Sequence, residues 1–268
     1  MSKLIAIDMD GTLLDDNKIL SEKNIEALEK AHNQGFEIVV ATGRSYTAAM
    51  PFIKQIKQGI VEYLICSNGA IIYNLNKKEI VFNDILSKEQ IVELLELNDY
   101  LGDTYIHFVN EDTIHAHQNP IGKYVIMDGY LSFLPIKLDS REELSSVKNL
   151  NKALITVDED FIDSTLARIP QEYFKKYNIV KSSENYIEVI NQGVDKGHAL
   201  EKLINKLNID KSNIVAIGDQ QNDLGMFELA GLSYAMSGAS DFIKSKATKI
   251  GPSNNDSGIA KILGEILS

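Results

Sequence analysis

The hydrophobic positions near the amino terminus follow a rhythm of short apolar runs separated by amphipathic stretches. Three continuous apolar runs are typical of strands that are buried on both faces of a sheet: residues 4–7, 38–41 and 63–66. Between them, residues 21–33 and 48–56 carry apolar side chains at helical spacing. Alternation of this kind predicts a parallel α/β sheet.

The rhythm changes after about residue 70. Residues 69–73 and 79–82 are typical of a hairpin, and Ser87 to Gln90 form a capping box that predicts a helix over 91–97. Further strands are expected at 105–109, 154–157 and 187–190, with short helices between them. The acidic run at residues 158–160 is interpreted as a helix start, not as a calcium site. This middle block therefore predicts an inserted α+β domain.

The first rhythm returns near Gly193. The pattern predicts helices at residues 197–207, 222–230, 242–247 and 259–267, and strands at 214–217 and 233–236. We therefore expect a doubly wound, mostly parallel α/β core, formed by residues 1–83 and 192–268. Residues 84–191 are expected to form the inserted α+β domain.

Charge and composition narrow the classes of partner. The 268 residues include 27 Lys and Arg against 38 Asp and Glu, a formal net charge of −11. Such a surface repels nucleic acid and anionic membranes, so an anionic substrate needs local positive groups. No segment approaches the ~18 apolar residues of a membrane span or resembles a signal peptide, so a cytoplasmic protein is expected. The single cysteine, Cys66, lies in an apolar run and is expected to be a buried hydrophobic residue.

Polar residues that could take part in catalysis or ligand binding follow the predicted strands. Asp8 and Asp10 end the first strand, Gly11 permits a sharp turn, and Thr42 with Gly43 ends the second. Ligand sites in open parallel sheets lie beyond the carboxyl ends of strands. Taken alone, the acidic pair is equally compatible with a polar strand cap, and a threonine in this position more often caps a helix.

Two later segments carry similar groups. Lys196 stands at a predicted helix start, where its charge opposes the helix dipole unless an anion such as phosphate is bound. Asp219, Asn222 and Asp223 follow the strand at 214–217 and offer the hard oxygen ligands that suit Mg²⁺. The simpler interpretations are a solvated lysine and a helix N-cap by Asn222 or Asp223.

The joint order of these segments is more specific than any one of them. In that order the chain resembles the haloacid dehalogenase superfamily, and within it the Cof-type phosphatases, with the nearest likeness to the YidA-like sugar phosphatases. The resemblance extends over essentially the whole chain. It rests on four segments: Ile7-Asp8-Met9-Asp10-Gly11-Thr12-Leu13-Leu14, Asn68-Gly69-Ala70, Ala167-Arg168-Ile169-Pro170-Gln171-Glu172 and Gly218-Asp219-Gln220-Gln221-Asn222-Asp223.

The resemblance implies roles for matching residues. Asp8 would be the nucleophile and a metal ligand, and Asp10 the general acid/base with its carbonyl on the metal. Asp219 would be the third metal ligand, and Asp223 would anchor the ligands from behind. The implied phosphate-binding residues are Met9 (by its backbone), Thr42, Gly43, Lys196 and Asn222. The chain departs from the family's usual pattern at Ser45 and at Ser237-Gly238-Ala239, outside the catalytic segments.

The expected function is therefore a Mg²⁺-dependent phosphatase that hydrolyses a small phosphorylated metabolite, with sugar phosphates favoured, through an aspartyl-phosphate. A phosphomutase or phosphotransferase would use the same intermediate, and phosphate release against transfer to a second sugar separates them. A metabolite-binding regulator is the alternative outside the enzymes, although a pure binder needs no nucleophile. Neither a nucleic acid nor a membrane is expected as a partner, and oligomeric state cannot be read from the sequence.

Histidines in the middle block form a further cluster. His107, His115 and His117 lie close together in the chain, and strand alternation could direct His115 and His117 to one face. Zinc binding is disfavoured because no Cys or acidic residue nearby has ligand spacing. Contact with a substrate hydroxyl is a second reading.

Overall fold

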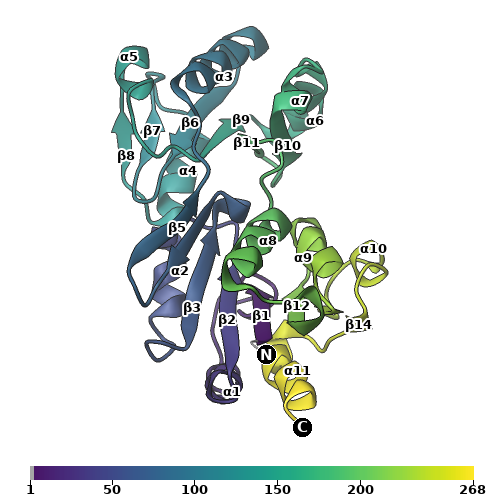
Figure 1. Cartoon of the computed structure of the whole chain (residues 1–268). Coiled ribbons are helices and arrows are strands. Elements are labelled where there is room, and N and C mark those ends of the chain that lie inside the picture. Colours follow the sequence, from purple (N-terminus) through teal and green to yellow (C-terminus); the bar gives the residue numbers. More distant parts are fainter. Residues whose placement is uncertain (1–2) are drawn as a thin grey trace. The chain divides into compact units, whose positions relative to one another are not determined.

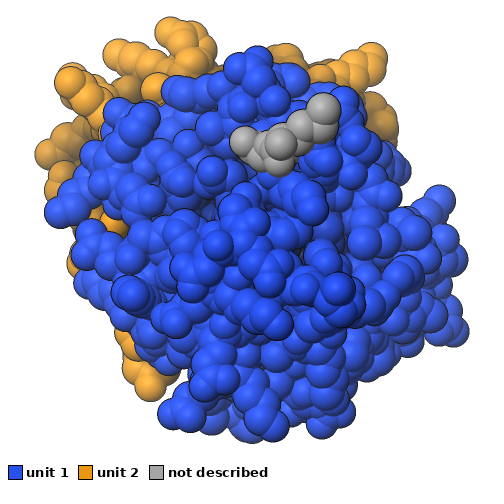
Figure 2. All heavy atoms as spheres, turned by 60° about the horizontal axis from the view of Figure 1, so that its bottom comes forward, with its two compact units in different colours: residues 1–43, 49–82, 195–268 blue, residues 44–48, 83–194 orange. Residues whose placement is uncertain are grey.

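The computed structural model describes residues 3–268, which divide into two compact units coloured separately in Figure 2. The first unit comprises the chain up to Gly43, Ala49–Phe82 and Asp195–Ser268. The second comprises Arg44–Ala48 and Asn83–Val194. Each unit has a sheet and an apolar core of its own.

The first sheet has eight strands in the order β14-β13-β12-β1-β2-β3-β4-β5. Neighbours from β14 to β3 are parallel, and β4 turns back antiparallel to β3. This order confirms the predicted doubly wound α/β sheet. The strand bounds are β1 Lys3–Asp8, β2 Phe36–Ala41, β3 Val61–Cys66, β4 Ile71–Asn74, β5 Glu79–Asn83, β12 Ile214–Gly218, β13 Leu232–Ala235 and β14 Lys249–Ile250.

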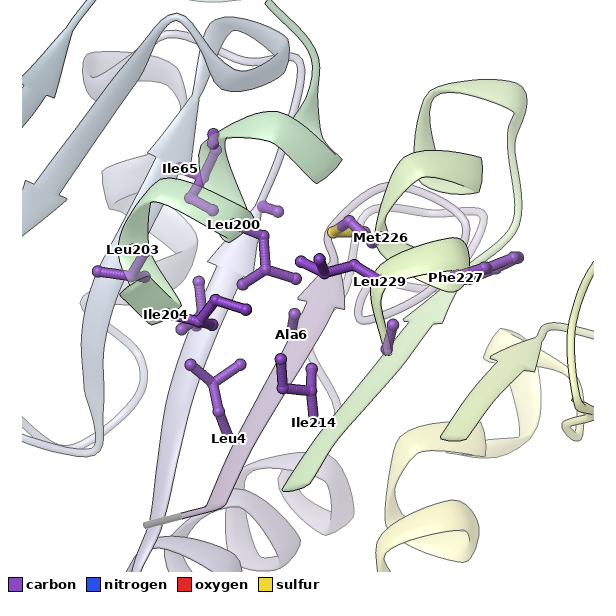
Figure 3. Close-up of a cluster of buried hydrophobic side chains, with 14 of the residues drawn as sticks. Leu4, Ala6, Ile65, Leu200, Leu203, Ile204, Ile214, Met226, Phe227 and Leu229 are labelled. Carbon is purple, nitrogen blue, oxygen red and sulfur yellow. The ribbon is translucent and has the colours of Figure 1, made fainter. Parts of the chain in front are cut away.

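Helices pack on the first sheet and form an apolar core with it. Their bounds are α1 Glu22–Asn33, α2 Tyr46–Ile53, α8 Lys196–Leu207, α9 Leu224–Leu229, α10 Asp241–Lys244 and α11 Gly258–Ile266. Alternate residues of β1, Leu4 and Ala6, pack with Leu200 of α8 and Met226 of α9 in the cluster drawn in Figure 3. The predicted helix at 222–230 is divided, since residues 221–223 form a 3-10 turn before α9.

The second unit contains a six-stranded sheet of order β10-β11-β9-β6-β7-β8, antiparallel except between β7 and β8. Its strands are β6 Tyr105–Val109, β7 Ile114–Ala116, β8 Ile136–Leu138, β9 Lys152–Thr156, β10 Tyr177–Lys181 and β11 Tyr186–Asn191. Its helices are α3 Lys88–Leu101, α4 Lys123–Ser132, α5 Arg141–Leu144, α6 Glu159–Arg168 and α7 Tyr173–Lys176. The predicted capping box is present at Ser87 and Gln90. The sequence pattern did not identify β7, β8 or β10.

The strand order determines where a site can form in the first unit. β1 lies between β2, which follows it in the chain, and β12, which comes after the insertion in the sequence (Figure 1). The carboxyl ends of these strands therefore meet where the winding direction reverses, the position at which open α/β sheets bind ligands. Among the described residues, no helix is long and apolar enough to cross a membrane.

Candidate active site

A buried ion-pair network lies at the carboxyl end of β1. Asp8, the last residue of β1, is 4% exposed, and Lys196 is fully buried at the first position of α8. The Lys196 ammonium donates to Asp8 Oδ1 at 2.5 Å and to Asp223 Oδ1 at 2.7 Å. The solvated-lysine interpretation of Lys196 is therefore wrong, because two carboxylates offset its charge at the helix start.

A third carboxylate, that of Asp219, is fixed beside this network. Thr12 donates its hydroxyl proton to Asp219 Oδ1 at 2.7 Å. Gly11 has φ of +80°, and a Cβ there would lie 2.5 Å from Asp219 Oδ2, so the turn requires glycine. Asp223 Oδ2 accepts the backbone N–H groups of Asp219 and Gln220 at 2.9 and 3.0 Å, which holds the loop after β12.

Negative charge is in excess in this cluster, since three carboxylates share one ammonium. Burial raises the pKa of Asp8 well above its usual range, Asp223 and Asp219 raise it further, and Lys196 opposes them. Burial likewise raises the pKa of Asp219. Burial alone would lower the pKa of Lys196, but Asp223 and Asp8 outweigh it and raise that pKa. The cluster is therefore poised to accept a further cation.

The donor set fits a hard divalent cation. Asp8, Asp219 and Asp223 can each offer a carboxylate oxygen, all within 4.8 Å of one another. Asp8 Oδ2 is buried and accepts no hydrogen bond from the described residues, so it is available as a ligand. Carboxylate oxygens are the ligands that Mg²⁺ prefers. The cluster includes Asp223, for which the resemblance implied only an anchoring role.

Asp10 lies outside that cluster. Its Oδ1 pairs with the Lys18 ammonium at 2.9 Å, and its side chain is 35% exposed. Met9 is fully buried, and its carbonyl accepts the Leu14 N–H at 2.9 Å, which closes the turn after β1. A carboxyl group that is accessible, yet two residues from Asp8, suits proton exchange with a ligand.

Polar groups suited to phosphate gather at the ends of β2, β3 and β12. Thr42 is buried, and its carbonyl accepts the Asn68 N–H at 3.1 Å. Asn222 donates its side-chain amide to Asn68 Oδ1 at 2.9 Å. Asn68 Oδ1 also stands 3.1 Å from where a Cβ of Gly43 would be. Thr42, Gly43 and Asn222 thus gather around Asn68.

Two residues of the site had no predicted role. Thr12 and Asn68 belong to segments that supported the family resemblance, but their partners Asp219 and Asn222 are distant in the chain. The only available signal was their place next to strand ends, which does not specify a partner.

Two histidines of the second unit, His107 and His115, are held by acidic residues. His115 Nδ1 lies 2.7 Å from Asp139 Oδ2, and His107 Nε2 lies 2.8 Å from Asp128 Oδ2. In the described part of the chain, metal-ligand spacing was found only for the three aspartates of the first unit. Elsewhere the acidic run precedes and opens α6 as predicted, and Cys66 is buried.

Comparison with known proteins identifies the family. The profile of the haloacid dehalogenase-like hydrolases matches residues 5–263. A Streptococcus pyogenes protein named putative phosphatase M6_Spy0533 is 32% identical over 259 residues, which are 96% of each chain. A crystal structure of a haloacid dehalogenase-like hydrolase from Bacteroides thetaiotaomicron superposes with a TM-score of 0.88, at 26% identity, over 99% of this chain and 100% of that one.

Relatives named for a substrate differ from one another. The Bacillus subtilis 5-amino-6-(5-phospho-D-ribitylamino)uracil phosphatase YcsE is 29% identical and covers 97% of this chain and 94% of its own. The Escherichia coli pyridoxal phosphate phosphatase YbhA is 27% identical and covers 98% of this chain and 97% of its own. The chain belongs to the haloacid dehalogenase-like hydrolases, as the sequence motifs indicated. Within that family it is of the phosphatase type.

Proposed function

We propose that this chain is a Mg²⁺-dependent phosphomonoesterase that hydrolyses small phosphorylated metabolites, with sugar phosphates favoured, through an aspartyl-phosphate on Asp8. The observation that carries the proposal is the environment of Asp8. One of its oxygens pairs with the buried Lys196, and the other is buried without a hydrogen-bond partner among the described residues. A structural aspartate would have both oxygens satisfied.

The chemistry divides between Asp8 and Asp10. An oxygen of Asp8 attacks phosphorus while the bond from phosphorus to the substrate oxygen breaks, and Asp10 gives its proton to the leaving oxygen. Asp10 then takes a proton from water, which attacks the phosphorus of the aspartyl-phosphate. The products are inorganic phosphate, the alcohol and the regenerated Asp8 carboxylate.

Charge neutralisation is the main requirement of this chemistry, because a carboxylate must approach a phosphate dianion. Lys196 provides one positive charge at Asp8. Asp8, Asp219 and the backbone carbonyl of Asp10 would hold Mg²⁺, and the position of Asp223 allows it to join them or to anchor Lys196. When bound, Mg²⁺ supplies positive charge to the phosphoryl oxygens and lowers the pKa of Asp8.

The phosphoryl group itself is proposed to be held by hydrogen-bond donors. These are the Thr42 hydroxyl, the Gly43 and Met9 backbone N–H groups, the Lys196 ammonium and the Asn222 amide. Donors of this kind position a phosphate without specifying what it is attached to. Substrate selectivity therefore has to come from residues outside this set, and the second unit is proposed to act as the cap that supplies them.

The preference for sugar-like substrates rests on the family resemblance and on the ribityl phosphate named for YcsE. The pyridoxal phosphate named for YbhA makes a phosphate ester of an aromatic compound the main alternative substrate. Turnover of the purified protein should be measured on a panel that includes sugar phosphates, polyol phosphates and pyridoxal phosphate, with Mg²⁺. Release of inorganic phosphate with a preference for sugar phosphates would support the proposal. Transfer of phosphate to a second sugar would indicate a phosphotransferase. Absence of turnover on every phosphorylated compound of the panel would contradict the proposed function.

A further inference from the structure

The turn after β3 has an unusual backbone. Ser67, Asn68 and Gly69 have φ of 49°, 52° and 104° in succession. Residues other than glycine rarely adopt positive φ, and such conformations cost free energy unless the surroundings hold them. Strain of this kind is concentrated at functional sites, which raises the question of what this turn contacts.

The backbone of the turn packs against two of the proposed phosphate-binding segments. The Asn68 N–H donates to the Thr42 carbonyl at 3.1 Å, which fixes the turn to the end of β2. A Cβ on Gly69 would lie 2.2 Å from the carbonyl oxygen of Asp195, the residue that immediately precedes Lys196. Only glycine permits this approach, so the turn also lies directly against the start of α8.

The side chain of Asn68 reaches the third segment. Its Oδ1 accepts the Asn222 amide N–H at 2.9 Å, across 154 residues of sequence. Asn222 is otherwise an exposed side chain in the loop after β12, and Asn68 is half-buried. A long-range hydrogen bond to a fixed turn restricts the Asn222 rotamer and removes entropy that phosphate binding would otherwise have to remove.

We propose that Asn68 is a positioning residue for the phosphate site, which holds the Asn222 amide in register with Thr42 and Gly43. This inference rests on the proposed function, since it assumes that these residues grip a phosphoryl group. A turn that needed only positive φ would be least strained with glycine. The asparagine retains a side chain there, and that side chain contacts Asn222.

The test is Asn68→Gly, which tolerates the positive φ and removes only the side chain. Loss of one positioning hydrogen bond should raise the inhibition constant of inorganic phosphate and the KM for p-nitrophenyl phosphate about three- to tenfold. The matched control is Asn208→Gly, because Asn208 is exposed, has φ of 53° and ends α8 away from the site. This control should leave both constants unchanged.

A double-mutant cycle with Asn222→Ala tests whether Asn68 acts through Asn222. If it does, Asn68→Gly should raise the inhibition constant of phosphate in the wild-type background and add nothing in the Asn222→Ala background. Additive effects would overturn the inference. A merely structural role would lower Tm and the active fraction while the inhibition constant stayed at the wild-type value, and that result would overturn it as well.

Failure of this inference is distinguishable from failure of the proposed function. If the wild-type protein neither turns over p-nitrophenyl phosphate nor binds inorganic phosphate, the proposed function is wrong. If the wild-type protein does both and Asn68→Gly behaves like Asn208→Gly, only the positioning role of Asn68 is wrong.

Discussion

The pKa values of buried aspartates are shifted in opposite directions in the two units. In the second unit, burial would raise the pKa of Asp139 and Asp128, but Lys137 and His115 around Asp139, and His107 beside Asp128, lower both. In the first unit, burial raises the pKa of Asp8, and Lys196 does not compensate for it. Asp139 and Asp128 of the second unit thus each have a cationic or hydrogen-bonding partner close to them.

The two sets of charged residues have different roles. The Asp139 carboxylate has a partner at each oxygen: Oδ2 lies 2.7 Å from His115 Nδ1, and Oδ1 lies 2.6 Å from Lys137 Nζ. Such pairs fix the structure and need nothing further. The aspartates of the first unit are left with excess negative charge at the ends of β1 and β12. That arrangement costs stability, which a bound cation and substrate can restore.

A substitution of Asp8 should separate the two classes of aspartate most clearly. Asp8→Asn should reduce turnover of p-nitrophenyl phosphate at least about a thousandfold, because an amide cannot attack phosphorus. Its metal-free Tm should not fall, because the amide is neutral and removes one charge from an overcharged cluster. Substantial residual turnover would rule out the aspartyl-phosphate.

Removal of metal should have the next largest effect. Turnover should be lost in EDTA and return with Mg²⁺, and Asp219→Ala should raise the Mg²⁺ concentration required at least about tenfold. Undiminished activity after chelation and dialysis would contradict the proposed metal site.

A thermal shift gives a second readout of the metal. Since the pKa of Asp8 is raised in the metal-free fold, stability is lost as pH rises through that pKa. Mg²⁺ binds the deprotonated carboxylate, so the rise in Tm that it produces should grow with pH and be reduced in Asp8→Asn. A shift that did not depend on pH would show that Asp8 is not a ligand.

The matching change in the second unit should act on stability. Asp139→Asn removes the charge from a buried partner of His115, which should cost about 1–3 kcal/mol. For a chain of this size that corresponds to a fall in Tm of about 3–10 °C, measured by calorimetry. Turnover of p-nitrophenyl phosphate should stay within about twofold of wild type. A large loss of turnover with Tm unchanged would remove the distinction between the units.

A substitution of His117 should have a smaller effect, which distinguishes a role in substrate selectivity from a role in catalysis. Burial lowers the pKa of His117, with Arg141 acting in the same direction, which favours the neutral imidazole. If the second unit determines substrate selectivity, His117→Ala should change kcat/KM several-fold for a sugar phosphate and little for p-nitrophenyl phosphate. His115 is a poor probe for this purpose because Asp139 holds it. Equal losses on both substrates would argue against a selectivity role for His117.

The smallest effect concerns an acidic pair away from the site. Burial, together with Glu62, raises the pKa of Glu37 from its ordinary value to about 7. The folded state therefore retains a proton that the unfolded state loses, and stability falls as pH rises from about 4.5 through 7. Glu37→Gln should flatten the dependence of Tm on pH in this window and raise Tm at pH 8. An unchanged pH profile would mean that the pair is not coupled.

Much of the first unit could be predicted because its strands are continuous apolar runs. Each predicted strand of that sheet corresponds to a strand, and the stripe of residues 21–33 corresponds to α1. The shorter strands of the second unit were harder: β10 carries Asn178 and Lys181 among its apolar residues, and β7 and β8 have only three residues each. Patterns this short cannot be distinguished from loops by periodicity.

The site was predictable to the extent that it depends on strand ends. Asp8, Thr42 and Asp219 could be proposed as site residues because a parallel sheet brings the carboxyl ends of its strands to one edge. Burial of Lys196 was not predictable, since it depends on two carboxylates from other segments. The contact between Asn68 and Asn222 was missed for the same reason, because sequence spacing carries no information about partners that tertiary folding selects.

The return of the chain to the first unit has an evolutionary consequence. Asp195 is the first residue after the insertion and the N-cap of α8, where its carboxylate accepts the His198 N–H at 2.7 Å. The very next residue is Lys196. Recombination could therefore replace the inserted unit as a module while leaving Asp8 and Asp219 in their own segments. The carboxyl-terminal splice point would be sharply limited, since a graft that ran one residue too far would replace the N-cap Asp195, and one that ran two residues too far would replace the lysine itself.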